Sequence, residues 1–193
     1  RRRPTGRRQQ VASAHSKVVA TYEYTDRDGN PLYEVIRYEP KDFKQKHGDT
    51  WGLDGVKRVI FNLPAVEEAM DRDEVVFYVE GEKDVQSLAK IGLVGTTHCG
   101  GSSGWKPEYA TFLTGAKLVI LPDNDGPGKA MAATVKAAVD GSAIVELPGL
   151  PSKGDVSDWI AAGGTADALL VMADEALSLY RPIQLANFLS EKG

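Results

Sequence analysis

The segment from Val75 to Asp84, VVFYVEGEKD, decides the fold, because a continuous apolar run ends abruptly in acidic residues. Two other places repeat this pattern. The run Leu118–Leu121 is followed by PDNDG at 122–126, and KGDVSD at 153–158 follows a third apolar run. Strand ends carry the chemistry in open parallel α/β sheets. The pattern therefore predicts three acidic sites at strand ends, and clustered carboxylates commonly hold divalent cations.

Working outward from this segment, short apolar strands alternate with helical stretches, which is typical of βαβ units and a parallel sheet. The strands show little polar alternation, as expected when both faces of a sheet are covered. We expect strands at 75–79, 93–97, 117–121 and 143–147, and helices at 83–91, 107–113, 127–139, 156–162 and 165–178. The fold class is therefore α/β, with a four-stranded parallel sheet flanked by helices.

The front part of the chain has a different pattern. Two β-rich stretches, Val18–Tyr24 and Leu32–Tyr38, flank a turn and predict a hairpin, and residues 43–46 predict a short third strand. A short helix is expected at Ala65–Met70, with Pro64 near its first turn. A small β-rich α+β subdomain should therefore precede the α/β domain.

These patterns divide the chain into four parts. We expect a basic disordered linker at 1–16, the β-rich subdomain at 17–73, the α/β domain at 74–180 and an exit segment or linker at 181–193 with a short helix at 183–190. Because the chain starts with arginine inside a linker-like stretch, we interpret it as a fragment of a longer protein.

Composition narrows the class of protein. With 42% apolar and 26% charged residues, the 193-residue chain is ordinary for a globular protein. No apolar stretch approaches the roughly 18 residues that span a bilayer, and the arginine-rich start leads into no signal core. Cys99 is a single cysteine, and no Cys/His set has zinc spacing. We therefore expect a cytoplasmic protein with no zinc in this fragment.

Charge is distributed unevenly along the chain. Residues 1–60 hold 13 Lys+Arg and 8 Asp+Glu, a net +5, whereas residues 61–193 hold 10 and 19, a net −9. A basic front beside an acidic site suits a polyanionic partner. The alternative is a solvated basic tail, since five positive charges lie within residues 1–8.

The acidic motifs carry a resemblance to a known family. Glu80-Gly81 after one strand, and Asp123-Asn124-Asp125 after a later one, resemble the two motifs of the Toprim domain, shared by bacterial-type primases, topoisomerases and some nucleases. The stretch 153–159 resembles the acidic segment of phage and plasmid primase-helicases, and parts of 35–65 are similar to the region before Toprim in phage-type primases. The resemblance covers about residues 74–163 and implies a Toprim-like sheet.

The resemblance implies the catalytic core of a DNA primase, a nucleotidyltransferase of DNA replication. Such an enzyme makes short RNA primers on a single-stranded DNA template from ribonucleoside triphosphates, in a bacterium or a host cell carrying a phage or plasmid. It implies a replicative helicase or a fused ATPase domain as partner, and no membrane. Two alternatives stay open at this point: a Toprim nuclease or DNA-cleaving enzyme, and a non-catalytic DNA-binding module.

The acidic residues are the expected catalytic and metal-binding groups, with Mg²⁺ or Mn²⁺ as cofactor. Two cations roughly 4 Å apart activate a hydroxyl and stabilise a leaving group in such sites. Helix capping is the alternative role for Asp155 and Asp158. We expect catalytic roles for Glu80, Asp123 and Asp125, and metal ligation by Glu80, Asp84, Asp123, Asp125, Asp155 and Asp158.

Basic residues and glycines are candidates for contacts with nucleotide or template. Cationic side chains neutralise phosphates, and glycine lets the backbone approach them closely. A flexible loop is the alternative for the glycines, and the strand tyrosines are expected to pack rather than stack on bases. The candidates are Arg37, Lys44, Lys46, Arg58, Lys83, Gly100, Gly101 and Lys129.

Overall fold

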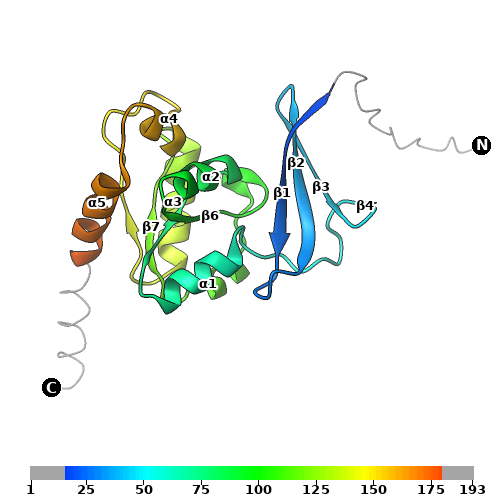
Figure 1. Cartoon of the computed structure of the whole chain (residues 1–193), viewed down its shortest axis with the longest axis horizontal. Helices are drawn as coiled ribbons and strands as arrows, with labels where there is room; N and C mark the ends of the chain where they lie inside the picture. The colour runs from blue at the N-terminus through cyan, green and yellow to red at the C-terminus, as the bar shows by residue number, and fades with distance from the viewer. Residues whose placement is uncertain (1–15, 180–193) are drawn as a thin grey trace, which may run out of the picture.

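The structure is a computed structural model that describes residues 16–179. The predicted linker up to residue 15 and the predicted exit helix at 183–190 lie outside the described residues. The described chain forms two four-stranded sheets, one antiparallel and one parallel. Figure 1 shows the antiparallel sheet standing beside the helix-covered parallel sheet, with α1 below them. Between residues 16 and 179, no helix is long and apolar enough to cross a bilayer.

The antiparallel sheet contains the predicted hairpin and third strand, which are confirmed. A short fourth strand was not predicted. Asp26 fixes the hairpin turn, because its Oδ1 accepts hydrogen bonds from the backbone N–H groups of Asp28 and Asn30. In the order β1-β2-β3-β4, the strands are β1 (Lys17–Thr25), β2 (Pro31–Glu39), β3 (Asp42–His47) and β4 (Thr50–Trp51).

One face of this sheet is buried against the rest of the molecule. Tyr24 lies opposite Tyr33 and Tyr22 lies opposite Val35, so these side chains share a face. All of them are buried, and the rings of Tyr24 and Tyr33 stack with centroids 4.5 Å apart. The expectation that these tyrosines pack in the core is confirmed.

The second sheet is parallel throughout, as predicted, with strand order β6-β5-β7-β8. Its strands are β5 (Val75–Tyr78), β6 (Val94–Thr96), β7 (Lys117–Ile120) and β8 (Ala143–Ile144). The α-helices are α1 (Leu63–Asp71), α2 (Glu82–Lys90), α3 (Gly126–Ala138), α4 (Val156–Ala161) and α5 (Ala166–Ser178). Each lies within two residues of its predicted range.

Two short segments are 3-10 helices, η1 (Gly101–Ser103) and η2 (Pro107–Phe112). We expected a helix at 107–113, and the structure makes it a 3-10 helix. The segment begins with proline and contains tyrosine, threonine and phenylalanine, which have modest helix propensity. Short pieces of this kind are where 3-10 geometry is usually found.

The parallel sheet is covered on both faces. On one face, a core cluster joins α1, η2 and α3 to the buried tyrosines of the antiparallel sheet. On the other, a second cluster joins α2, α4 and α5. Helix α1 contacts β5 and β6 and also β1, so it packs against both sheets.

The linker before α1 is bonded to both sheets. The Tyr33 hydroxyl donates to the Val59 carbonyl at 3.1 Å, and the Thr96 hydroxyl donates to the Phe61 carbonyl at 2.7 Å. The Asn62 side-chain amide donates to the Gly95 carbonyl at 3.1 Å. These bonds fix the antiparallel sheet beside the carboxyl end of β6.

Candidate functional site

Glu80 and Asp123 follow neighbouring strands of the parallel sheet. Tyr78 at the end of β5 lies beside Ile120 at the end of β7, and the Leu121 N–H donates to the Tyr78 carbonyl at 2.9 Å. The two carboxyl groups are close enough for each to affect the pKa of the other. The strand-end pattern in the sequence therefore corresponds to two carboxylates, Glu80 and Asp123, that lie near each other at the carboxyl edge of the sheet. This edge is called the acidic edge below.

The electrostatics of this edge are unfavourable for bare carboxylates. Burial raises the pKa of Asp123 to about 7, with help from its acidic neighbours. Burial also raises the pKa of Glu80, and its Oε2 is buried with no hydrogen-bond partner. The charges that act on Asp123 are, in decreasing order, those of Glu80, Asp84, Asp155 and Asp125.

These carboxylates fit a divalent cation in donor type and charge. Mg²⁺ and Mn²⁺ prefer oxygen ligands, and a cation would neutralise the unpartnered Oε2 of Glu80. Among the residues from 16 to 179, however, no three Asp, Glu, His or Cys side chains are arranged as a finished metal-binding group. The side chains of Glu80, Asp123 and Asp125 would therefore have to adjust to complete a coordination shell.

Asp125 caps the helix that follows β7. Its Oδ1 accepts a hydrogen bond from the Gly128 N–H at 2.8 Å, which holds the first turn of α3 against the loop. A Cβ at Gly128 would lie 2.7 Å from the Asp123 carbonyl oxygen, so only glycine fits this close approach. One oxygen of Asp125 is thus used for capping.

The remaining acidic residues are engaged within the protein. Asp155 and Asp158 form a capping box at the start of α4, in which each side chain accepts a hydrogen bond from the other's backbone N–H. Asp84 is 5% exposed and accepts a hydrogen bond from the Ser157 hydroxyl. Lys83 Nζ lies 2.7 Å from Asp155 Oδ2. Their predicted metal ligation stays a prediction, and capping is the role that the structure gives Asp155 and Asp158.

Two cations of the antiparallel sheet act electrostatically on acidic residues that follow β5. Arg37 lies on the same face of β2 as Tyr33, and its positive charge opposes the rise in pKa that burial causes in Glu82. Its Nε is buried without a hydrogen-bond partner. Lys41, in the turn between β2 and β3, acts in the same way on Glu80. Lys41 was not predicted, because nothing in its turn marks it as different from other exposed lysines.

Lys44 and Lys46 point the other way. They lie opposite Ile36 and Glu34, which alternate with the inward residues of β2. Lys44 Nζ lies over the Tyr38 ring, 5.2 Å from its centroid, and Lys46 Nζ is 3.0 Å from a Glu34 carboxylate oxygen. The structure therefore does not bring these two lysines to the acidic edge.

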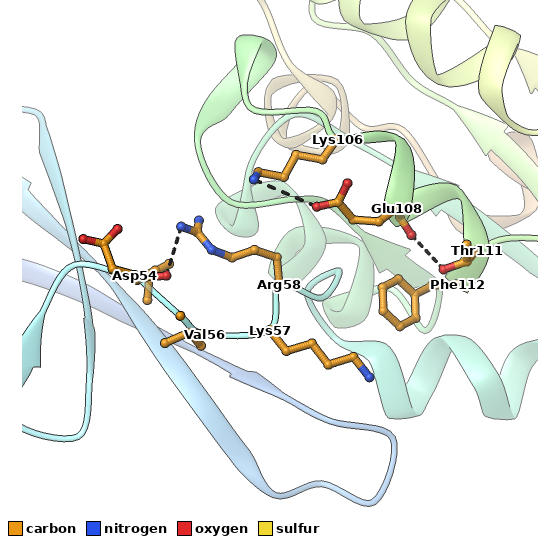
Figure 2. Close-up of a pocket in the computed structure, with 10 residues that line it drawn as sticks. Asp54, Val56, Lys57, Arg58, Lys106, Glu108, Thr111 and Phe112 are labelled. Atoms are coloured by element: carbon orange, nitrogen blue, oxygen red, sulfur yellow. Dashed lines mark hydrogen bonds and ion pairs between the residues drawn. The ribbon is translucent and has the colours of Figure 1, made fainter.

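Arg58 lines a pocket of about 550 Å³ between the linker and η2. Figure 2 shows the side chains of Arg58 and Lys106, which line this pocket, coming from two different segments of the chain. An Arg58 guanidinium N–H donates to the Leu53 carbonyl at 3.3 Å, and Phe112 supplies an aromatic wall. Lys106 was not predicted, since only the fold brings η2 next to the linker.

Lys129 and the glycine pair lie at the same edge of the sheet as the carboxylates. Lys129 lines a pocket of about 220 Å³ together with Asp123, and its Nζ is 3.1 Å from a Glu146 oxygen. Gly100 and Gly101 follow β6 with φ of 107° and 64°, a conformation that favours glycine. Their predicted contact with phosphate stays a prediction.

The comparisons with known proteins identify the fold. No protein-family model matches the chain, and no curated protein sequence matches it. Among solved structures, the primase fragment of the bacteriophage T7 primase-helicase is similar with a TM-score of 0.57 and 14% identity, over 79% of this chain and 60% of that one. The Aquifex aeolicus primase, with its zinc-binding and RNA polymerase domains, gives 0.63 and 16%, over 81% and 40%.

A third similar structure is the DnaG primase catalytic domain bound to single-stranded DNA, with a TM-score of 0.59 and 18% identity over 83% of this chain and 54% of that one. The chain thus spans less than two thirds of each of these structures. It has the fold of primase catalytic cores, so the predicted Toprim-like α/β fold with a β-rich subdomain in front is confirmed.

Proposed function

We propose that this chain is the catalytic part of a DNA primase, which makes short RNA primers on single-stranded DNA by metal-dependent nucleotidyl transfer. The observation that carries this proposal is the meeting of Glu80, Asp123 and Asp125 at the carboxyl edge of a sheet whose fold is shared with primase cores.

Phosphoryl transfer depends mainly on positioning and on neutralising charge. Mg²⁺ or Mn²⁺ held by Glu80, Asp123 and Asp125 would neutralise the triphosphate and acidify the attacking 3′ hydroxyl. Glu80 is the candidate to take the proton from this hydroxyl, because burial raises its pKa, which makes its carboxylate a stronger base, and its Oε2 has no hydrogen-bond partner.

The cations around the acidic edge provide contacts for nucleic acid and nucleotide. Arg58 and Lys106 line the pocket between the subdomains, and Phe112 offers a surface on which a base can stack. Arg37 and Lys41, on the antiparallel sheet, act electrostatically on Glu82 and Glu80. We assign the pocket to the template strand and the latter pair to the ribonucleoside triphosphate. Single-stranded DNA as template agrees with the similar DnaG domain.

A helicase is the proposed partner, either separate or fused to the chain. The similar T7 fragment comes from a primase-helicase, which supports this assignment. A module that only binds DNA is disfavoured, because the unneutralised carboxylates at the acidic edge would repel DNA phosphates.

The experiment that tests the proposal incubates the protein with single-stranded template, ribonucleoside triphosphates and Mg²⁺ or Mn²⁺. Short RNA products are the expected result. Asp123→Asn should abolish them, whereas Asp174→Asn, an exposed aspartate on α5, should not. Shortened template without primers would instead identify a nuclease, and DNA binding with neither reaction would identify a non-catalytic module.

A further inference from the structure

Two adjacent threonines at the carboxyl end of β6 are fully buried. Thr96 is the last residue of β6 and Thr97 is the next one, and each is 0% exposed. Each hydroxyl donates to a backbone carbonyl in another segment. The Thr96 hydroxyl bonds to Phe61 in the linker before α1 at 2.7 Å, whereas the Thr97 hydroxyl bonds to the Glu80 carbonyl at 3.0 Å. The two side chains are therefore alike in type and burial, and they differ in the segment that each one holds.

The segment held by Thr97 is the turn that carries Glu80 from β5 into α2. Just before it, the Val79 N–H donates to the Thr96 carbonyl at 3.0 Å, so the chain is still bonded to β6 at this point. Just after it, Gly81 is the N-cap of α2 and has no side chain that could accept a hydrogen bond from the first helical turn. Glycine also has the greatest backbone freedom of any residue. The Thr97 hydroxyl therefore fixes the Glu80 backbone where the helix start itself does not.

Thr97 can act as a fixed point because it is itself constrained. Its carbonyl accepts a hydrogen bond from the Phe61 N–H at 2.8 Å, which ties it to the linker that is bonded to both sheets. Its side chain is branched at Cβ, which restricts χ1. The hydroxyl therefore has a set direction, and the Glu80 carbonyl is bonded to a rigid part of the molecule.

Glu80 needs such a restraint when no cation is bound. Burial, and after it the negative charge of Asp125, raise its pKa, and its Oε2 has no hydrogen-bond partner. A carboxylate in this situation gains free energy by moving toward water and away from other carboxylates. A fixed backbone limits this movement and keeps the oxygens of Glu80 near Asp123 and Asp125.

We propose that Thr97 is a positioning residue for the acidic edge, whose hydroxyl holds the Glu80 backbone so that the carboxylates are arranged for a divalent cation before the cation binds. The inference rests on the proposed metal-dependent function and adds to it a residue outside the carboxylate set. Thr97 contacts neither the cation nor the substrate in this role. Groups that orient metal ligands typically contribute about 10- to 100-fold to metal affinity.

Titration with Mn²⁺ followed by electron paramagnetic resonance tests this without relying on activity. Thr97→Val keeps the shape of the side chain and removes the hydroxyl, so it should weaken Mn²⁺ binding by about 10-fold. Thr97→Ser keeps the hydroxyl and should retain most of the affinity. Thr96→Val is the matched control, because it removes the neighbouring hydroxyl from an equally buried place and leaves the bond to Glu80 intact. It should bind Mn²⁺ as the wild type does.

Thermal melts of the metal-free proteins separate positioning from a general loss of stability. Both valine variants should melt at a lower temperature than the wild type, because each leaves a carbonyl without its hydroxyl donor. Only Thr97→Val should also lose affinity for Mn²⁺. Equal losses of affinity in both variants would mean that the hydroxyls only stabilise the fold. That result, or an unchanged affinity in Thr97→Val, would overturn the inference and leave the proposed function intact.

The wild-type titration separates the inference from the function on which it rests. If the wild-type protein binds no Mn²⁺, the metal requirement itself is contradicted and both proposals lose their basis. If Thr97→Val does not fold, Thr97→Ala is the second variant, since its smaller side chain leaves room for a water molecule at the Glu80 carbonyl. Such a water molecule is not fixed to the chain, so the affinity for Mn²⁺ should still fall, and an unchanged affinity would overturn the inference.

Discussion

The acidic edge of the parallel sheet has two halves that look alike in sequence and differ in structure. In one half, Glu80 and Asp123 have raised pKa values, and an oxygen of Glu80 is buried without a partner. In the other half, burial also raises the pKa of Asp84, to about 6, but Asp84, Asp155 and Asp158 accept hydrogen bonds from within the protein, and Lys83 pairs with Asp155. In the first half, no ion pair among residues 16–179 involves Glu80 or Asp123, and Lys41 acts on Glu80 only from a distance. In the second half, Lys83 forms an ion pair with Asp155.

This difference teaches that a carboxylate at a strand end is not by itself a metal ligand. Asp155 and Asp158 follow an apolar run just as Asp123 does, yet their oxygens stabilise the first turn of α4. What separates the two groups is whether the protein itself satisfies the charge. Each prediction that follows tests this division.

The largest effect is expected from Asp123→Asn. Losing one carboxylate of the unneutralised half should reduce primer synthesis by about 100-fold or more, because charge neutralisation is the main catalytic contribution. The rise in melting temperature on adding Mg²⁺ should shrink as well, since the cation stabilises only the native state. Primer assays and thermal melts with and without Mg²⁺ measure both effects. Unchanged values in the variant would mean that the two halves do not differ in this way.

The second effect concerns stability against pH in the metal-free protein. The pKa of Asp123 is about 7 in the folded state, above its ordinary value near 4, so the folded state binds more protons than the unfolded state between these values. The free energy of unfolding is therefore highest, as far as Asp123 decides it, at low pH, and it falls as the pH rises from about 4 toward 7. Asp123→Asn should stabilise the metal-free protein at pH 8 by about 1–2 kcal/mol.

Urea denaturation across this pH range, with a chelator present, measures the effect. Asp174→Asn is the control, because this exposed residue of α5 should leave the pH profile unaltered. If the free energy of unfolding of Asp123→Asn depends on pH as that of the wild type does, the unfavourable charge is not on Asp123.

A smaller effect is expected in the satisfied half from Ser157→Ala. Asp84 is 5% exposed, and without the Ser157 hydroxyl it would lose a hydrogen-bond donor in a buried place. The free energy of unfolding should fall by about 1–2 kcal/mol. Chemical denaturation measures this, with Ser152→Ala at an exposed turn as control. A fall of equal size in both variants would show that the Asp84 contact contributes nothing specific.

The smallest effect is expected from Asp158→Ala. The capping box would lose one of its two hydrogen bonds, which should lower stability by about 0.5–1 kcal/mol and the melting temperature by about 2 °C. The apparent affinity for Mg²⁺ should stay within about twofold of the wild type, since this residue belongs to the half that the protein satisfies itself. Calorimetric titration with Mg²⁺ checks this, and a large loss of affinity would make Asp158 a ligand.

Much of the fold was predictable because its elements have strong local signals. The apolar strands β5 and β7, and the capped helices α3 and α4, lie where the sequence placed them. The strand β4 was missed, because two residues carry no detectable periodicity. Strand ends also predicted correctly that Glu80 and Asp123 meet, since the carboxyl ends of parallel strands share an edge.

The partners of each side chain were not predictable from local sequence. Arg37 lies on one face of the antiparallel sheet, and Lys44 and Lys46 lie on the other, because successive residues of a strand alternate between the faces. Which face points inward depends on how the sheet packs. Lys41 acts on the charge of Glu80, and Lys106 and Arg58 line one pocket, only because segments distant in sequence come together. Such contacts follow from the tertiary fold.

The bond between Tyr24 and Glu82 limits how the two subdomains can move. The Tyr24 hydroxyl donates to Glu82 at 2.7 Å, and Glu82 is only 7% exposed and two residues from Glu80. If the antiparallel sheet moved away, this bond would break and the buried carboxylate of Glu82 would lose its partner, which opposes a hinge motion between the two subdomains. The Tyr24–Glu82 bond therefore holds the antiparallel sheet at a fixed distance from the start of α2, so the spacing between the two subdomains is set by the folded protein itself.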